Sequence, residues 1–210
     1  MYDYLSSAIV TLLVTLDPPA LAPIFLSVTR GMTADERKRV AIRASLIALI
    51  IMAFFAVAGD ATLKLLGVSL PAFRIAGGLL LFWIAFEMVF ERRNARKNDL
   101  AETAITEDHI QNIAAFPLAI PLMAGPGAIT AMLLLAGRTQ GDMLLMSLLL
   151  VVTAAMIGVC LVVFLLAEPI ARMLGTTGNI VLTRLLGVIL AALAVQFLID
   201  GVKAAFRLTG

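Results

Sequence analysis

Asp17 is the residue of this sequence whose type and position most clearly suggest chemistry. It lies within an apolar stretch, residues 5–27, and is followed directly by Pro18 and Pro19. A carboxylate at the centre of a membrane-spanning helix costs about 2.5–3.5 kcal/mol on insertion scales, so it needs a partner or a role. Asp before Pro is a favourable helix start, so one interpretation is that Asp17 caps a new half-helix. The other is that the capped carboxylate also binds a ligand ammonium or a proton.

The prolines after Asp17 predict a break in this helix. Because proline has no backbone N–H and clashes with the carbonyl four residues earlier, Pro18 and Pro19 free the carbonyls of Val14 and Thr15. The break falls about 18 Å into the stretch at about 1.5 Å per residue, near the middle of a bilayer. Backbone groups freed at that depth are tolerated where protein or a water-filled cavity satisfies them. An ordinary proline kink is the alternative interpretation.

A second stretch, residues 112–136, contains three prolines and two glycines but no acidic residue. We expect a half-helix to restart after Gly125 with its first amides uncapped. Those amides, with about half a positive charge from the helix dipole, favour an anion. The two stretches together predict a site for a small zwitterion, with its carboxylate on the amides of Gly127 and Ala128 and its ammonium at the first break. Small neighbours such as Ala20 restrict the site to a small substrate.

The elements that must position these residues are membrane-spanning helices. Of the 210 residues, 61% are hydrophobic and 14% are charged, and the mean hydropathy is +1.03. Soluble domains average about 45–50% apolar and about 25% charged residues, so a water-soluble globular enzyme is excluded. At about 20 residues per spanning helix, the apolar residues suffice for about six crossings. The expected spans are residues 5–27, 41–62, 72–90, 112–136, 143–168 and 180–202.

The basic residues indicate the topology of the chain. Eleven of the sixteen Lys and Arg residues lie in or beside the loops after the first, third and fifth expected spans. Because Lys and Arg concentrate in cytoplasmic loops, this face is assigned to the cytoplasm and both termini to the periplasmic side. The long polar segment, residues 91–111, is then a cytoplasmic connector. The net charge of +2 is read as a topology signal and not as a nucleic-acid-binding patch.

The two halves of the sequence resemble each other. Shifting the chain so that Pro18 falls on Pro126 also lays Ala20 on Ala128, and later landmarks keep the same order. A chance match of small residues in an apolar chain is the alternative. Three spans per half is an odd number, so the second copy enters the membrane from the other side, as in many secondary transporters. We therefore expect a first repeat at residues 1–90, the connector at 91–111 and an inverted second repeat at 112–210.

Several classes of protein are disfavoured by what the sequence lacks. With one cysteine and one histidine, disulfide frameworks and Cys/His metal clusters are not expected, and we predict neither a metal site nor a cofactor. The sequence has no GxxxxGK[ST] run for ATP and no HExxH or GxSxG pattern, so it is not expected to be an enzyme. A small-molecule substrate and the lipid bilayer are the expected partners, with no nucleic acid. The oligomeric state stays open.

Arg74 and Arg184 occupy matching positions at the starts of the third and sixth expected spans. One interpretation is that they are interfacial anchors whose side chains extend to the membrane surface. The other is that they are gates, which pair with acidic residues such as Glu168 or Asp60 during alternating access.

Other polar and small residues of the spans have structural interpretations. Glu87 is expected to be a solvated charge at the end of the third span, in preference to a proton relay. Gln196 either lines a cavity or hydrogen-bonds a neighbouring helix. Gly77, Gly78 and Gly187 are expected to allow close helix packing.

Several strings of the sequence match a known family. PLAIPLMAGPGAI at residues 117–129, FRIAGG at residues 73–78, and the run from Asp17-Pro18 to Pro23 followed by FLSVT resemble the MarC family of bacterial and archaeal inner-membrane proteins. The resemblance implies an all-α polytopic membrane protein with six transmembrane helices in two inverted three-helix repeats. The prolines described above add that helices 1 and 4 are broken near the membrane centre. It also implies a multi-pass protein of the bacterial inner (plasma) membrane.

The family resemblance also suggests a substrate. The sequence is similar to SnatA-type members, which are described as transporters of small neutral amino acids. The hypothesis is a secondary transporter of the glycine, alanine and serine type, with proton coupling through Asp17. An exporter of another small metabolite or drug, and a non-transporting membrane protein, are the alternatives. One departure bears on the substrate, because many relatives have Gly and Asn where this chain has Ala20 and Leu21.

Overall fold

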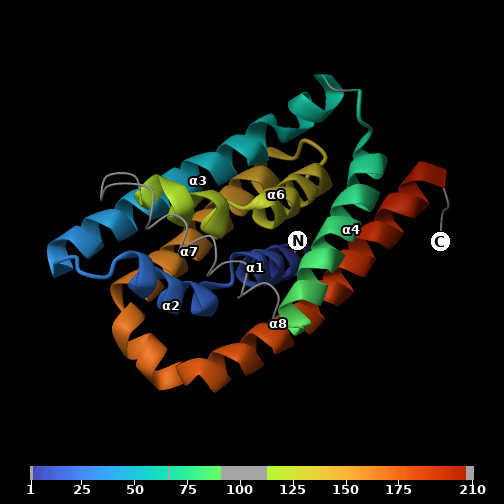
Figure 1. Ribbon diagram of the computed structural model, residues 1–210. Helices are drawn as coiled ribbons and strands as arrows, with labels where there is room; N and C mark the ends of the chain where they lie inside the picture. The colour runs from blue at the N-terminus through green and yellow to red at the C-terminus, as the bar shows by residue number, and fades with distance from the viewer. Residues whose placement is uncertain (1, 66, 91–112, 207–210) are drawn as a thin grey trace.

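Every regular element that the computed structural model describes is a helix (Figure 1). The described residues are 2–65, 67–90 and 113–206, and the connector predicted at residues 91–111 lies outside them. Within them, five segments are long and apolar enough to cross a membrane: α1 with α2, α3, α4, α7 and α8. The helices are α1 (Tyr2–Leu16), α2 (Pro18–Val28), α3 (Ala34–Leu65), α4 (Leu70–Val89), the π-helix η1 (Ala114–Met123), α6 (Pro126–Arg138), α7 (Met143–Leu165) and α8 (Ala167–Phe206).

The stretch predicted at residues 112–136 is two short helices. The π-helix η1 has 10 residues and α6 has 13, so neither alone is long enough to span a bilayer. The α1–α2 segment is also made of two helices, but together they form one apolar segment of 27 residues. Both stretches that were expected to be broken are therefore interrupted.

Helix α3 begins earlier than the hydropathy pattern predicts. Its first residue is Ala34, within a charged run, whereas the expected span starts at residue 41. A reciprocal capping box explains the difference: the Thr33 N–H donates to the Glu36 carboxylate at 2.8 Å, and the Glu36 N–H donates to Thr33 Oγ1 at 3.4 Å. Both exposed donors at the helix start are thereby satisfied. The Thr-x-x-Glu spacing is visible in the sequence and could have placed this start.

Helix α8 includes a segment that was expected to be a loop. Residues 169–179 are helical except at Gly175, whose φ of +58° and ψ of −177° are non-helical and where α8 changes direction (Figure 1, orange segment). Glycine adopts a positive φ without a Cβ clash, so the chain turns there and continues as a helix.

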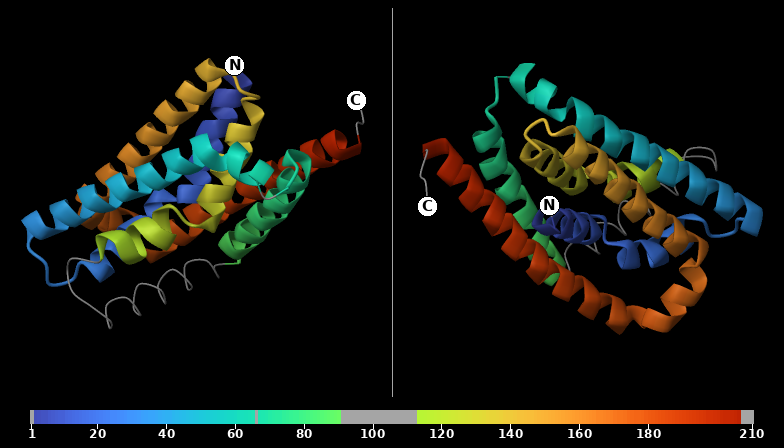
Figure 2. Two further views of the ribbon diagram at one scale, coloured as in Figure 1. Left: turned by 90° about the horizontal axis from the view of Figure 1, so that it is seen from above. Right: turned by 180° about the vertical axis from the view of Figure 1, so that it is seen from behind.

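Two helix pairs enclose α1. Helix α4 packs along α8 and α3 packs against α7. Helix α1 lies between the two pairs in Figure 1 and in the right panel of Figure 2. The approach of α4 to α8 requires glycine. A Cβ on Gly78 would lie 2.8 Å from the Ala194 carbonyl oxygen, and a Cβ on Gly187 would lie 2.8 Å from Met88 Cβ. The packing role expected for these glycines is confirmed.

The α1–α2 segment is the most enclosed of the five apolar segments. In its most apolar window 67% of the residues are buried, against 28% for the α7 and α8 segments. Polar groups on such a helix are satisfied by protein, water or a ligand, because lipid offers no hydrogen bonds. The outer faces of α7 and α8 instead expose apolar side chains, including Val151, Val162, Leu185 and Val188.

Candidate functional site

The first predicted break is present at Asp17. Helix α1 ends at Leu16 and α2 begins at Pro18. Asp17 between them has φ 54° and ψ 61°, a left-handed conformation that Asp tolerates better than most residues. Its N–H donates to the Leu13 carbonyl at 2.9 Å and closes the last turn of α1. The Asp17 side chain is fully buried, so the break places a carboxylate inside the bundle.

The prediction that Asp17 caps α2 is wrong, because its side chain makes no capping hydrogen bond. The first two helical residues are Pro18 and Pro19, which have no N–H to be capped. The first available amide, that of Ala20, donates to the Asp17 backbone carbonyl at 3.1 Å. An N-cap side chain usually projects from an extended backbone, and Asp17 is left-handed. The Asp17 carboxylate is therefore buried at the helix break without a capping role.

The residues predicted around Asp17 are buried in the apolar core. Val14, Thr15, Pro18 and Ala20 are all buried. Pro18 and Pro19 have no N–H to donate to the carbonyls of Val14 and Thr15. The Thr15 hydroxyl donates to the Thr11 carbonyl at 2.7 Å.

Thr11 is a buried polar residue that the sequence reasoning missed. It is fully buried, and its Oγ1 has no hydrogen-bond partner in the described structure. Thr11 and Thr15 are four residues apart, so they share one face of α1. Two threonines at this spacing in an apolar helix are a signal that could have been used.

Helix α2 passes through Pro23 without a break. The sequence pattern assigns α1 and α2 one interruption, and the structure places it at Asp17 alone. Pro18 and Pro19 lie at the first positions of α2, where no N–H is needed, whereas Pro23 lies inside the helix and lacks the N–H for the Pro19 carbonyl, yet α2 continues to Val28.

The second predicted break is wider than the first. Within η1, Phe116 (φ −130°, ψ 126°) and Ile120 (φ −127°, ψ 124°) have extended backbone. Each precedes a proline, which disfavours the helical conformation for the residue before it. The Ile113 carbonyl accepts from the Leu118 N–H at 3.4 Å. Pro117 therefore does not leave it without a donor, as a simple kink would.

Helix α6 starts as expected after Gly125. Gly125 is extended (φ −81°, ψ 172°), no side chain caps the helix, and Pro126 is its first residue. The amides of the first turn have no partner within an α-helix, so Gly127 and Ala128 present theirs at the positive end of the helix. Gly125, Gly127 and Ala128 are buried. A Cβ on Gly127 would lie 2.4 Å from Ile84 Cδ1 of α4, so a larger residue here requires the Ile84 side chain to move.

The two breaks share one core. Leu16 and Leu21 beside the first break belong to the same buried apolar cluster as Ala124 and Ala128 beside the second. The α1–α2 break and the start of α6 lie close together near the middle of the bundle in both figures (Figures 1 and 2). The predicted site residues are thus gathered from the two halves of the sequence into one buried region.

Arg74 and Arg184 have different surroundings. The Arg74 guanidinium is partly buried and donates to the Gly137 carbonyl, at the end of α6, at 3.2 Å. Arg184 lies on α8 and is exposed. Glu168, one of the acids expected to pair with them, forms an exposed ion pair with Arg172 one turn further along α8. In this conformation Arg74 therefore binds a backbone carbonyl of α6, and Glu168 binds Arg172 of its own helix.

Further contacts tie the end of α6 to α1. The Tyr4 hydroxyl donates to the Leu135 carbonyl at 3.2 Å, and the Arg138 guanidinium donates to Ser7 Oγ at 3.3 Å. With the Arg74 contact, three hydrogen bonds fix this end of α6 to α1 and α4. None of them was predicted, because hydrogen bonds between segments 63 or 131 residues apart carry no spacing signal in the sequence.

Two further expectations about polar residues are wrong. Glu87 is 7% exposed, so it is a buried residue and not a solvated charge. The Gln196 amide donates to the Asp200 carboxylate of the same helix at 2.8 Å, on an exposed face. It therefore neither lines a cavity nor reaches a neighbouring helix. Among the described residues, no three His, Cys, Asp or Glu residues lie together as metal ligands.

Several apolar spanning helices, with an interrupted segment and a buried carboxylate, define a multi-pass membrane protein. A family model described as "MarC family integral membrane protein" matches residues 2–206. The chain belongs to this family, as the sequence strings indicated.

Relatives of the chain include membrane proteins of archaea and bacteria. A "UPF0056 membrane protein" of Archaeoglobus fulgidus is 38% identical over 202 residues, which cover 95% of this chain and 92% of that protein. A UPF0056 membrane protein of Aquifex aeolicus is 35% identical, with 93% of this chain and 91% of the relative covered. One of Escherichia coli is also 35% identical, with 90% and 87% covered. No solved structure matches the chain.

Proposed function

We propose that this protein is a secondary transporter of small neutral amino acids of the glycine, alanine and serine type. The observation that carries the proposal is Asp17, a fully buried carboxylate at a helix break that is not used for capping. A buried ionisable residue within a membrane-spanning segment is by default a candidate functional residue. The similarity to SnatA-type members is part of this proposal.

In the proposed site a zwitterion lies between the two breaks. The substrate ammonium binds the Asp17 carboxylate and the carbonyls at the end of α1, near Val14 and Thr15. The substrate carboxylate binds the first-turn amides of α6, at Gly127 and Ala128. Helix ends at a break provide the two charges that a zwitterion needs, because a C-terminal end is negative and an N-terminal end is positive. Small buried neighbours such as Ala20 and Ala124 favour a small side chain.

The proposed architecture has six spans in two inverted repeats. The α1–α2 segment, α3 and α4 form the first repeat, and η1 with α6, α7 and α8 form the second. Each repeat then begins with an interrupted segment, and Pro18 of α2 corresponds to Pro126 of α6. The second and third spans of each repeat pack against their counterparts in the other repeat: α3 contacts α7, and α4 contacts α8. An inner-membrane location with both termini periplasmic completes this topology.

The proposed cycle alternates access to the site from the two faces. Arg74 belongs to the set of hydrogen bonds that fixes the end of α6, and we propose that this set opens when the substrate reaches the other face. Arg184 is its counterpart in the second repeat. A proton on Asp17 is the proposed coupling ion, because a carboxylate can carry it across in place of a substrate ammonium. No enzymatic step and no cofactor is needed.

Uptake into proteoliposomes tests the function. Purified full-length protein is reconstituted, and uptake of radiolabelled glycine, alanine and serine is measured with and without an imposed proton gradient. We expect uptake of at least one of them, stimulated by the gradient and lost in Asp17→Asn. Asn has the same shape without the charge, and it sacrifices no helix cap here. If correctly inserted wild-type protein takes up none of the three, the amino-acid assignment is wrong, and export of another solute becomes the leading function.

A further inference from the structure

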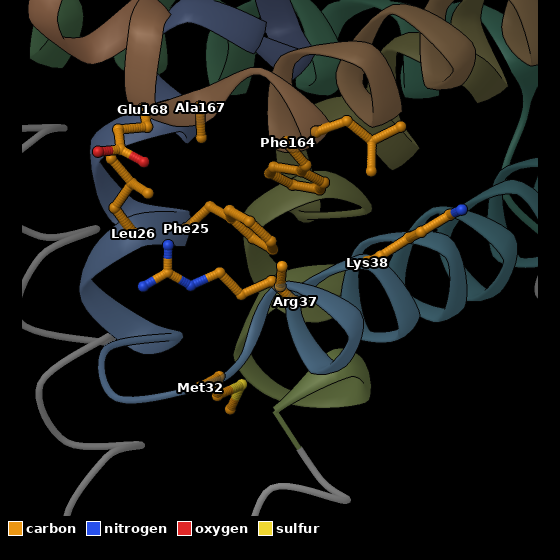
Figure 3. A pocket seen from close by; sticks show the side chains of 10 residues that line it. Phe25, Leu26, Met32, Arg37, Lys38, Phe164, Ala167 and Glu168 are labelled. Carbon is orange, nitrogen blue, oxygen red and sulfur yellow. The ribbon is translucent and has the colours of Figure 1, made fainter.

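A pocket apart from the two breaks lies where four helices end or begin. It forms between the end of α2, the start of α3, the end of α7 and the start of α8, and its volume is about 300 Å³. Phe25 and Phe164 stack with their ring centroids 4.7 Å apart and form an apolar wall. Figure 3 shows the two rings against each other above Arg37. The pocket therefore combines an apolar surface with a cation.

Arg37 is the residue that gives the pocket its chemistry. Its guanidinium extends across the pocket toward Leu26, whereas the Lys38 ammonium points away from it (Figure 3). The Arg37 Nε is buried and has no hydrogen-bond partner. A buried guanidinium N–H without an acceptor is unfavourable, and an anionic oxygen is its best acceptor. Glu168, the acidic residue of the lining, is already paired with Arg172, so the charge available in the pocket is positive.

The position of the pocket in the bundle indicates where the anion comes from. Helix α2 ends at Val28 and α7 ends at Leu165. Spanning helices end where the hydrocarbon gives way to lipid head groups, so the pocket lies at the height of the phosphates. Leu165 lines the pocket and is 48% exposed, which continues the apolar outer face of α7. A lipid can therefore reach the pocket from the bilayer.

We propose that this pocket binds an anionic phospholipid. Its phosphate oxygens accept hydrogen bonds from the Arg37 guanidinium, and the upper part of an acyl chain packs against Leu165 and Phe164. The pocket belongs to the face rich in Lys and Arg, and basic sites at membrane surfaces attract anionic head groups. A soluble anion would use the cation but not the apolar wall or the opening toward lipid. The proposal does not rest on the transport function.

Native mass spectrometry of the detergent-purified full chain tests the proposal. Phosphatidylglycerol and phosphatidylcholine are titrated separately, and bound lipid is counted. We expect wild-type protein to prefer phosphatidylglycerol. We expect Arg37→Gln to bind it about tenfold more weakly, since a charge-assisted contact to phosphate is lost, and to weaken phosphatidylcholine binding by a smaller factor, because choline offsets the charge of that phosphate. The matched control is Arg39→Gln, which removes the same charge from an exposed residue of α3 outside the pocket lining and should leave the preference intact.

A second variant and a soluble competitor distinguish lipid binding from a folding defect and from binding of a free anion. Arg37→Lys keeps the charge but loses the planar fork, so we expect an intermediate preference; it replaces Arg37→Gln if that variant does not fold. Excess glycerol phosphate is added as a soluble competitor. If it displaces phosphatidylglycerol, the pocket takes a free anion and the lipid assignment is wrong. If both Arg37 variants bind lipid as the wild type does, the pocket is not the binding site.

Discussion

The two interrupted segments of this protein both break a helix inside the bundle, but the backbone conformation at the two breaks differs. The first break is confined to one residue, Asp17, in a left-handed conformation between two regular helices. The second is spread over η1, where Phe116 and Ile120 are extended, and it ends at an extended Gly125. In both, the helix that follows begins with proline and has no side-chain cap. The first break holds a carboxylate, and the second offers only backbone.

In the proposed site, this difference makes the two breaks complementary in charge. The Asp17 carboxylate adds negative charge to the end of α1, which already carries the negative end of a helix dipole. The first turn of α6 adds nothing to its positive end except glycine and alanine, so its amides remain accessible to an anion. A pair of identical breaks would bind one kind of charge. A negative break paired with a positive break suits a ligand that carries both charges.

Removing the prolines of the first break has the largest expected effect. In Pro18→Ala/Pro19→Ala two restored amides can donate to the Val14 and Thr15 carbonyls, and each added hydrogen bond favours a continuous helix by about 1 kcal/mol. We expect glycine uptake in proteoliposomes to fall about tenfold or more, since about 1.4 kcal/mol corresponds to tenfold. Pro126→Ala is the matched control, because the extended residues of η1 still interrupt the second segment. Equal losses in both variants would show that the two breaks are not different in kind.

A larger side chain at the second break has the next largest expected effect. Gly127→Val places a side chain where Ile84 Cδ1 lies 2.4 Å from a Cβ, and overpacking of this kind costs about 1–3 kcal/mol. We expect a lower midpoint of thermal unfolding and reduced glycine uptake. Adding Ile84→Ala makes room and should restore part of both. If stability returns but uptake does not, the Gly127 amide acts in binding as well as in packing.

Removing the contact of α4 with the end of α6 has a smaller effect. Arg74→Gln loses a charge-assisted hydrogen bond to the Gly137 carbonyl, which contributes about 1.5–3 kcal/mol. The change should lower the thermal midpoint and alter the rate of uptake while glycine binding stays unchanged, because neither break is touched. Arg184→Gln, at an exposed residue, is the comparison. An equal effect of the two variants would contradict the distinction between the arginines.

The smallest effect is expected far from both breaks. Thr33→Ala removes the capping box at the start of α3 and should destabilise the protein by about 1 kcal/mol. Glycine uptake per folded molecule should not change. This variant gives the baseline for a purely structural loss, and a large drop in its uptake would mean that stability alone explains the other variants.

The sequence predicts the apolar segments and the positions of both breaks because hydropathy and proline act locally. Proline removes its own N–H wherever it lies, so α2 starting at Pro18 and α6 starting at Pro126 follow from the chain alone. The side-chain partners do not follow. Gln196 was expected to line a cavity or to hydrogen-bond a neighbouring helix, but it bonds Asp200 on its own helix. Asp17 was expected to cap a helix whose first two residues have no N–H. Both outcomes depend on backbone conformation and neighbouring helices, which a linear pattern does not contain.

Equilibrium binding of radiolabelled glycine to purified protein tests the central claim most directly, namely that Asp17 and the start of α6 bind opposite ends of one zwitterion. Competition with acetate, which lacks the ammonium, and with methylamine, which lacks the carboxylate, accompanies the titration of wild type and Asp17→Asn. Loss of a buried charge pair costs about 2–5 kcal/mol, so we expect at least about tenfold weaker glycine binding in the variant, and weak competition by both analogues. Glycine binding of wild-type strength in folded Asp17→Asn would contradict the account.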